Sequence, residues 1–401
     1  MPAKIDGMSS IIRAAKSLLI VAGAAAMFLV TVRAQSGAAS GPSTGLAPSE
    51  ANHFIETPKG WMHPRTAWGD PDLTGIWPIA HGLNLVRSCP RAGGPGRGGA
   101  PAAAPAAPAA PPCDPDHIAL FKTEAAYTAE VERALGVRKT GDAATQALAK
   151  GNFGAALQGG VTDPTFPERQ TSMIVDPPNG KLPEFTTEGK RRSALMRSSW
   201  AATGETDQVW DKPEDFDSWD RCITRGMPSS MMPYRYNNGI EIFQAPGMVV
   251  LSLEMIHEDR IVYTDGRPPL KPVHKQYMGE PRGRWEGHTL VITTTNYKEG
   301  PSGTNIGVFG SPAGNRFPVS DQMKTTERLT RLNDNTILYE MKVEDPVVMV
   351  QPYTVRFPLR LNNGYEWWEY NCHEGNRTIR DYINASRAER ARAQQDNSQS
   401  R

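Results

Sequence analysis

The amino-acid sequence predicts a mainly β protein, an antiparallel barrel or sandwich that follows a helical, loop-rich N-terminal region. From residue 236 onward, short segments rich in Val, Ile, Thr and aromatic residues alternate with turn sequences such as Ala245-Pro246-Gly247. No helical pattern separates these segments, which argues against a parallel α/β sheet. The 37 glycines and 34 prolines of the 401-residue chain agree with a fold that contains many turns.

Composition and charge narrow the class of protein further. With 39% hydrophobic and 22% charged residues, the chain is too apolar to be disordered throughout. Its 44 Lys and Arg balance 43 Asp and Glu, whereas a dedicated nucleic-acid binder is usually clearly basic. We therefore expect a small-molecule substrate or ligand as partner, and no nucleic acid. The sequence leaves the oligomeric state open.

Residues 1–34 have the pattern of an export signal. Basic residues precede an apolar run at 17–32, which is shorter than the roughly 20 residues that a membrane span needs. Val32-Arg33-Ala34 resembles a cleavage site, and an uncleaved N-terminal anchor is the alternative. Both interpretations predict a periplasmic or secreted protein with no later membrane span. Residues 35–58 are rich in Ser, Gly, Ala and Pro and predict a disordered leader.

Residues 59–235 are predicted to wrap the barrel as a region of loops and short helices. Helical periodicity and capping residues indicate a helix at about 117–135, a second from Thr186 or Thr187 to about 201, and a short third one at 217–225. The role of residues 137–160, which are small and Gly-rich, stays open.

Residues 236–385 are predicted to form the β-barrel domain, and residues 386–401 a disordered tail. Asn333-Asp334-Asn335 joins two long predicted strands and indicates a hairpin. The predicted strands are 239–244, 248–255, 260–264, 288–297, 324–332, 336–343 and 353–361.

Four cysteines, an even number in a chain with an export signal, favour disulfide bonds. Cys89 and Cys113 flank an Ala/Pro/Gly-rich segment, so a bridge between them is the preferred pairing. That choice leaves Cys222 and Cys372 as a long-range bridge, although three pairings are possible. A thiolate metal site on these last two cysteines is the alternative, but no C-x-x-C spacing supports it.

Several distinctive blocks lie between about residues 60 and 385. They include WGDPDLTGIW (68–77), RQTSMIVDPPNGKLP (169–183), WDRCITRGMP (219–228), residues 240–270, GEPRGRWEGHTLVITTTNY (279–297) and TERLTRLNDNTILYEMKVEDP (326–346). These blocks resemble a large family of exported proteobacterial and acidobacterial proteins. The resemblance implies a lipocalin-like antiparallel barrel and implies no particular reaction.

The stretch 257–286 is dense in titratable residues and is the first candidate site, because small ligands often bind at a barrel mouth. His257 is a candidate acid or base near neutral pH. Arginines of this stretch are suited to hold a carboxylate or an enolate. The alternative is that Arg and Glu pair across strands as structural ion pairs. Of these residues, we assign His257 and Arg284 to catalysis, and Arg267, Arg282 and Glu286 to substrate binding.

A second candidate site lies in residues 367–376, where aromatic residues neighbour His373 and Glu374. If Cys222 bonds Cys372, Arg225 and His373 come close together. We therefore add His373 to the catalytic candidates, and Trp368 and Arg225 to the substrate-binding ones. Tyr234, in the segment PYRYNN, is a further catalytic candidate as a general acid, and an aromatic strand start is its alternative. The alternative is a disulfide-linked C-terminal strand whose tryptophans belong to the core.

Three function classes fit these residues. The preferred one is an exported enzyme that acts on a small organic molecule by acid–base chemistry, as a lyase, isomerase or hydrolase, without an organic cofactor. A periplasmic carrier for an apolar ligand is the main alternative, and an envelope interaction protein is a third. No metal site is predicted, although two histidines from different strands with a carboxylate are able to hold a divalent ion.

Overall fold

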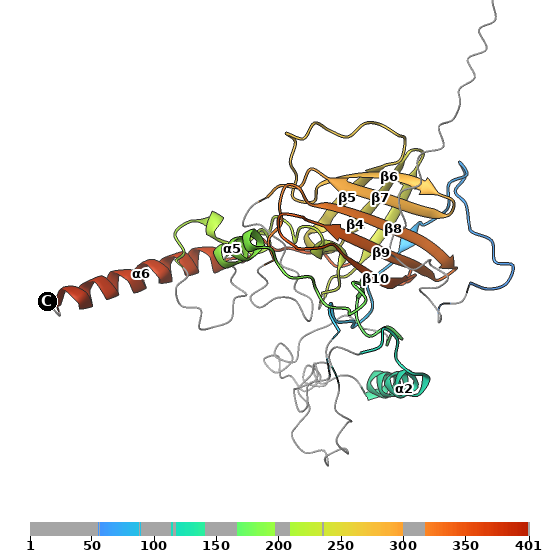
Figure 1. Cartoon of the computed structure of the whole chain (residues 1–401), viewed down its shortest axis with the longest axis horizontal. Coiled ribbons are helices and arrows are strands. Elements are labelled where there is room, and N and C mark those ends of the chain that lie inside the picture. Colours follow the sequence, from blue (N-terminus) through green and yellow to red (C-terminus); the bar gives the residue numbers. More distant parts are fainter. Residues whose placement is uncertain are drawn as a thin grey trace, which may run out of the picture. The chain divides into compact units, whose positions relative to one another are not determined.

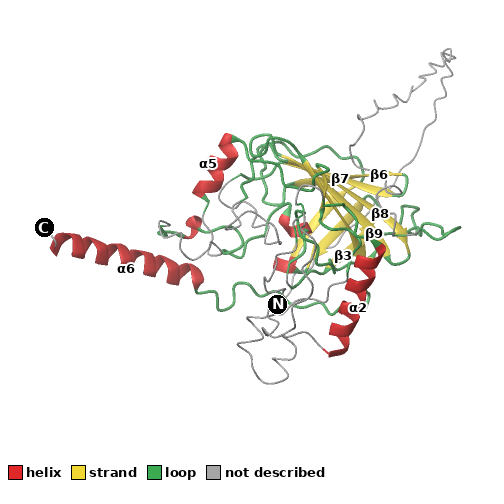
Figure 2. Ribbon diagram, turned by 60° about the horizontal axis from the view of Figure 1, so that its bottom comes forward, coloured by secondary structure: helices red, strands yellow, loops and turns green. Residues whose placement is uncertain are grey.

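The computed structural model describes the backbone of most of the chain beyond residue 54. Figure 1 shows the chain coloured along its sequence, and Figure 2 separates helices, strands and loops. The described residues are 55, 57–87, 89, 114, 118–140, 167–196, 209–234, 236–299 and 317–399. The predicted signal, most of the leader, Cys113 and residues 141–166 lie outside them.

The described residues form one ten-stranded sheet that curls into a half-barrel (Figure 1). Neighbouring strands of the sheet pair antiparallel, except β5 and β6, which pair in parallel at Tyr263 and Arg282. Across the sheet the order is β1-β3-β4-β5-β6-β7-β8-β9-β10-β2. The strands are β1 Gly75–Ile76, β2 Ile174–Asp176, β3 Ile240–Ala245, β4 Met248–Leu253, β5 Glu258–Tyr263, β6 Glu280–Glu286, β7 Thr289–Thr295, β8 Lys324–Asn333, β9 Thr336–Glu344 and β10 Tyr353–Arg360.

The mainly β fold class is therefore confirmed. Seven of the described strands lie where the sequence predicts them, and the hairpin at 333–335 joins β8 to β9. The sequence did not predict β1, β2 or β6.

The core lies on the concave side of the sheet and includes residues from outside it. Alternate residues of β9 and β10, such as Tyr339, Met341 and Phe357, are fully buried in this core. Trp77 and Met231 belong to the same cluster, although neither lies in a strand of the sheet. Side chains of the segments before β3 thus occupy the interior of the half-barrel.

Residues 77–85 connect the two edges of the sheet. At the first edge, the backbone of Trp77 donates to the carbonyl of Ile240 at 2.7 Å, next to β1. At the other edge, the backbone of Ile174 in β2 donates to the carbonyl of Leu85 at 3.0 Å. Because one short segment bonds to both edges, it bridges the gap that the ten strands leave open.

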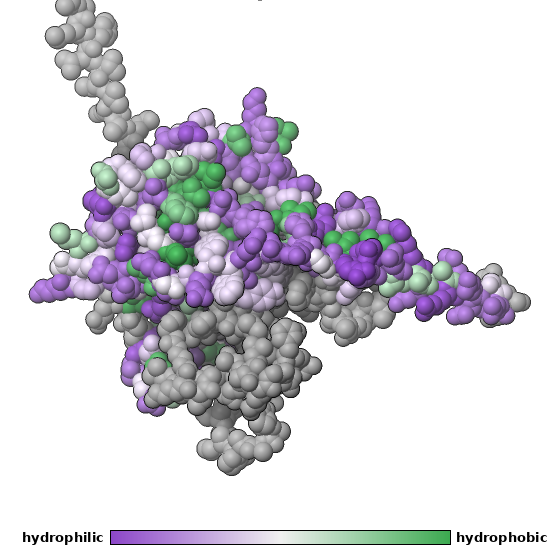
Figure 3. Space-filling view, turned by 180° about the vertical axis from the view of Figure 1, so that it is seen from behind, coloured by the Kyte–Doolittle hydropathy of each residue, from purple (hydrophilic) through white to green (hydrophobic). Residues whose placement is uncertain are grey.

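The described α-helices are α2 (Glu124–Thr140), α5 (Thr187–Leu195) and α6 (Thr378–Gln399). The first two overlap predicted helices. Within the described ranges, no helix is both long enough and apolar enough to cross a membrane. A hydrophilic surface with small hydrophobic groups covers the face drawn in Figure 3.

Two predictions about helical structure were wrong. Residues 217–225 form turns instead of a helix, because Asp217 Oδ1 accepts from the backbone of Asp220 at 2.7 Å and Cys222 has a left-handed φ of 55°. Residues 386–399 belong to α6 and are not a disordered tail. The Arg, Ala, Glu and Gln residues of this segment favour a helix, and Ser386 fixes its first half by accepting from the backbone of Trp210 at 3.1 Å.

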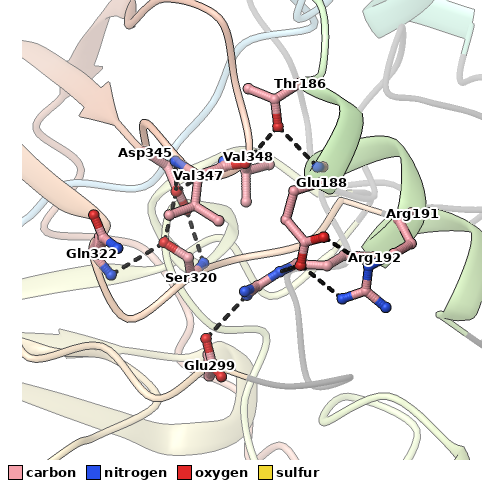
Figure 4. Close-up of polar contacts among 11 residues, drawn as sticks. Thr186, Glu188, Arg191, Arg192, Glu299, Ser320, Gln322, Asp345, Val347 and Val348 are labelled. Carbon is pink, nitrogen blue, oxygen red and sulfur yellow. Dashed lines mark hydrogen bonds and ion pairs between the residues drawn. The ribbon is translucent and has the colours of Figure 1, made fainter.

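Helix α5 is fixed to the β9–β10 connection by its N-terminus (Figure 4). Thr186 caps the helix by accepting from the backbone of Gly189 at 2.9 Å, and its hydroxyl donates to the carbonyl of Val347 at 2.5 Å. Asp345 orders the same connection by accepting from the backbone of Ser320 at 2.8 Å.

Candidate functional site

Strained backbone marks one corner of the half-barrel, where β4 turns into β5. Ile256 and His257 in this turn have left-handed φ values of 63° and 39°. Cys222 and Asn237, with φ values of 55° and 52°, lie in segments that contact the same turn. Left-handed non-glycine residues cost free energy and concentrate at functional sites. We call this region the strained corner: residues 219–225, 234, 236–239, 254–258 and 365–373.

Glu254 holds the segments of the strained corner together. Its buried carboxylate accepts four hydrogen bonds, from Asn237 Nδ2 at 3.0 Å, Gly239 N at 3.0 Å, Tyr365 Oη at 2.6 Å and Trp368 N at 2.8 Å. A buried carboxylate is stable only when such donors replace its hydration. Glu254 therefore fixes the geometry of the site and has no lone pairs to spare for chemistry.

An aromatic cluster surrounds the guanidinium of Arg225 in the strained corner. Its Cζ lies 5.3 Å from the ring centre of Trp219 and 5.2 Å from that of Tyr234, within the range of cation–π attraction. Tyr236 meets Tyr234 edge-on at 5.1 Å, and Tyr370 accepts from Trp219 Nε1 at 3.2 Å. Burial lowers the pKa of Arg225 to about 10, opposed by the three tyrosines. The cluster thus holds a desolvated cation against aromatic rings.

His257 and Glu258 lie side by side in the sequence and are oriented by different partners. The Nδ1 atom of His257 lies 3.2 Å from the carbonyl oxygen of Tyr370, so the tautomer with a proton on Nδ1 donates to that oxygen. The carboxylate of Glu258 accepts from Thr224 Oγ1 at 2.6 Å. Burial raises the pKa of Glu258, and the hydrogen bond from Thr224 and the charges of Arg260 and His257 oppose the rise. Glu258 thereby retains its proton to higher pH than an exposed glutamate.

Two residues after Glu258 in β5, Arg260 forms an ion pair with Glu327 inside the half-barrel. Arg260 Nη1 donates to Glu327 Oε1 at 2.9 Å, and Tyr339 Oη donates to the same oxygen at 2.7 Å. Arg260 is 2% exposed and Glu327 is fully buried. Burial lowers the pKa of Arg260, but the charge and hydrogen bonds of Glu327 outweigh this and raise it. The side chains of Arg260 and Glu327 therefore extend the row of titratable residues from the strained corner into the core.

The structure brings several of the sequence-predicted site residues together. His257, Tyr234, Arg225 and Trp368 all lie in the strained corner. His373 follows the disulfide-bonded Cys372, and its side chain is exposed.

The remaining predicted residues lie elsewhere, in ion pairs that are exposed for Arg284 and Arg267 and largely buried for Arg282. Arg284 donates to Glu286 at 2.6 Å on the outer surface of β6, and Arg328 of β8 binds the same carboxylate at 2.9 Å. Arg267 pairs with Asp265 and stacks on a tyrosine ring, and Arg282 pairs with Glu280. The sequence analysis gave ion pairs across strands as its alternative. Arg328–Glu286 joins two strands, whereas the pairs of Arg284, Arg282 and Arg267 lie within one strand or turn.

Cys222 and Cys372 form the predicted long-range disulfide, with their Cα atoms 5.5 Å apart. Cys89 is also disulfide-bonded, and Cys113 lies outside the described residues. The bridge excludes a thiolate metal site on Cys222 and Cys372. Over the described ranges, no three His, Cys, Asp or Glu side chains are grouped as metal ligands would be.

Sequence reasoning did not single out Thr224, Glu254 or Glu327. Glu327 gave little signal, because KTTERLTRL also holds Lys324, Arg328 and Arg331. A signal was present for Glu254, because it interrupts the largely apolar run MVVLSLEM. A charge at such a position indicates a buried, partnered group. Thr224 gave no such signal, because its contact with Glu258 depends on the turn at 217–225.

An open cavity of about 240 Å³ lies beside α5, away from these residues. Its arginines are already engaged, since Arg191 donates to Glu188 at 2.7 Å and Arg192 bridges Glu188 and Glu299 (Figure 4). The strained corner therefore remains the stronger candidate. Comparison with protein-family models, curated proteins and solved structures found no match.

Proposed function

We propose that the chain is an exported enzyme that acts on a small organic molecule by acid–base chemistry, as a lyase, isomerase or hydrolase. The observation that carries the proposal is His257, in strained backbone, next to the buried carboxylate of Glu258. Two titratable groups with different environments are what acid–base catalysis requires. Tyr370 orients the ring of His257, and burial raises the pKa of Glu258.

In this proposal His257 and Glu258 exchange protons with the substrate. A proton on Nδ1 directed at the Tyr370 carbonyl leaves Nε2 of His257 as the nitrogen that accepts a proton. Glu258, with its raised pKa, supplies or removes the second proton. Neither step needs an organic cofactor.

Arg225 and Trp368 are the proposed substrate-binding groups. Arg225 is 3% exposed and donates to the carbonyl of Met232, so it acts on the strained corner as a buried positive charge. Such a charge favours an anionic or strongly polarised carbonyl group nearby. The side chain of Trp368 is 65% exposed beside the buried Glu254 and offers apolar surface to the rest of a substrate. We infer a small organic acid, ester or lactone as the substrate class.

The main alternative, a carrier for an apolar ligand, has less support. Small barrels that carry ligands hold them in the barrel interior. Here Trp77, Met227, Met231 and Met232 share one hydrophobic cluster with the inward-facing residues of the strands. The chain's own side chains thus occupy the space that a carried ligand needs.

The test combines a ligand search with matched variants. The protein is incubated with a library of small acids, esters, lactones and lipids, and both its melting temperature and the consumption of each compound by mass spectrometry are recorded. His257→Asn and Glu258→Gln should each reduce turnover about 100-fold or more. His274→Asn, at an exposed histidine outside the strained corner, is the control and should leave turnover unchanged.

The same experiment contains the results that would contradict the proposal. Turnover that survives both substitutions excludes the His257–Glu258 pair as acid and base. A lipid that raises the melting temperature without being consumed supports the carrier instead.

A further inference from the structure

Residues 57–63 reach the end of the half-barrel opposite to the strained corner. There they contact two hairpin turns of the sheet. Trp61 Nε1 donates to Asp334 Oδ1 of the β8–β9 turn at 2.8 Å. The ring of His63 stacks on the ring of His288 of the β6–β7 turn, with centroids 3.7 Å apart and planes 3° from parallel. We call residues 57–63 the N-terminal strap.

The side chains of Trp61 and His63 provide much of the attachment of the N-terminal strap. Trp61 also meets His63 edge-on at 4.6 Å, so the two contacts support each other. Met62 between them is 84% exposed and adds little buried surface. A segment held by few contacts opens at low free energy, so a small change in one contact shifts its docking.

The surroundings of His63 disfavour its protonation. Arg65, two residues after His63, and Arg331 of β8 both act on His63 as positive charges. The carboxylates nearby are engaged elsewhere: that of Asp334 accepts from Trp61, that of Asp72 accepts from Thr74, and that of Glu286 pairs with Arg284 and Arg328. Burial, His288 and the two arginines lower the pKa of His63.

The geometry of the pair does not suit a metal ion. The lone pair of an imidazole nitrogen lies in the plane of its ring. In two rings that are stacked 3° from parallel, these lone pairs run side by side and do not meet at one point. A proton is therefore the more suitable ligand for this pair.

We propose that the His63–His288 stack is an acid-released clasp, which holds the N-terminal strap on the sheet while the rings are neutral and releases it when they are protonated. Two charged rings 3.7 Å apart repel each other, and separation relieves the repulsion. Since the pKa of His63 is lower when docked than when free, the released strap binds protons more readily. Docking is complete above the ordinary pKa of 6.5 and is lost as the pH falls below it.

Hydrogen exchange measured by mass spectrometry on the full chain tests the clasp. Peptides that cover residues 57–66 are compared at pH 7.5 and pH 5.5, after correction for the intrinsic exchange rate at each pH. We expect the protection of these peptides to fall about tenfold at pH 5.5, which corresponds to about 1.4 kcal/mol of opening free energy. Peptides from β7 to β9 serve as the internal control and should keep their protection.

Two variants separate protonation of the rings from a general effect of acid. His63→Phe and His288→Phe each keep a flat ring for stacking and leave at most one titratable ring in the pair. In His63→Phe, the N-terminal strap should stay protected at pH 5.5, because the ring whose pKa docking lowers is gone. In His288→Phe, burial and the two arginines still act on His63, so the loss of protection should be smaller than in the wild type but not abolished. Equal losses in the wild type and in both variants would overturn the proposal, as would a wild-type strap that is equally protected at both pH values.

Discussion

Glu327→Leu should strongly destabilise the protein, because it leaves the guanidinium of Arg260 buried without its carboxylate. Arg260 is 2% exposed, and Glu327 Oε1 accepts its Nη1 donor at 2.9 Å. Breaking a buried ion pair by removing one partner costs about 3–5 kcal/mol. Tyr339 loses the acceptor of its 2.7 Å hydrogen bond as well, which adds about 1 kcal/mol. We therefore expect a loss of about 4–6 kcal/mol in the free energy of unfolding.

Urea unfolding of the wild type, both single variants and the double variant Arg260→Met/Glu327→Leu checks this magnitude. The double variant removes both charges and should recover most of the loss, because apolar replacement of a buried pair is often neutral or stabilising. A loss below about 1 kcal/mol in Glu327→Leu would show that the pair is solvated and would refute the reasoning. So would a double variant no more stable than the less stable single variant.

Three further predictions concern other parts of the chain. Because the pKa of Glu258 is raised above its ordinary 4.5, its ionisation costs stability as the pH rises. Urea unfolding should therefore find Glu258→Gln more stable than the wild type at pH 7.5 and equally stable at pH 4. Gly189→Ala would place a Cβ 2.1 Å from the carbonyl oxygen of Val348, so hydrogen exchange in α5 should accelerate. Replacing Cys222 and Cys372 by serine removes a disulfide that closes a loop of 150 residues. The free energy of unfolding should fall by about 5 kcal/mol, which a lower melting temperature would reveal.

The strands could be predicted from the sequence where β-branched and aromatic residues stand at the positions that the sheet buries. Runs such as HTLVITTTNY combine β-branched residues with burial on one or both faces, and they became strands. Strand β6, with the sequence EPRGRWE, has the composition of a loop. It forms because its backbone pairs with β7 along its length and because Gly283 allows close approach to Val262. Such pairing between segments leaves little trace in local composition.

The sequence pointed to residues of the candidate site by two routes: His257 through the charge-dense stretch 257–286, and the others through a cysteine or an aromatic cluster. Arg225, Tyr234 and Trp368 come together because the Cys222–Cys372 bridge and Glu254 join distant segments. Arg284 lies in an exposed ion pair with Glu286, and a charge-rich strand fits such a surface as well as a barrel mouth. Which face of the strand is covered decides between the two, and tertiary packing sets that face.

The segment that bridges the edges of the sheet also bears on the order of folding. Its partners lie far along the chain: Ile76 pairs with Glu241 in β3, and β2, which Leu85 contacts, pairs at Ile174 with Val355 in β10. A chain synthesised from its N-terminus exposes Trp77 and Leu85 long before either partner exists. Loop-closure entropy makes such distant contacts slow to form. The apolar residues of this early segment therefore need shielding from other chains until the last strand is in place.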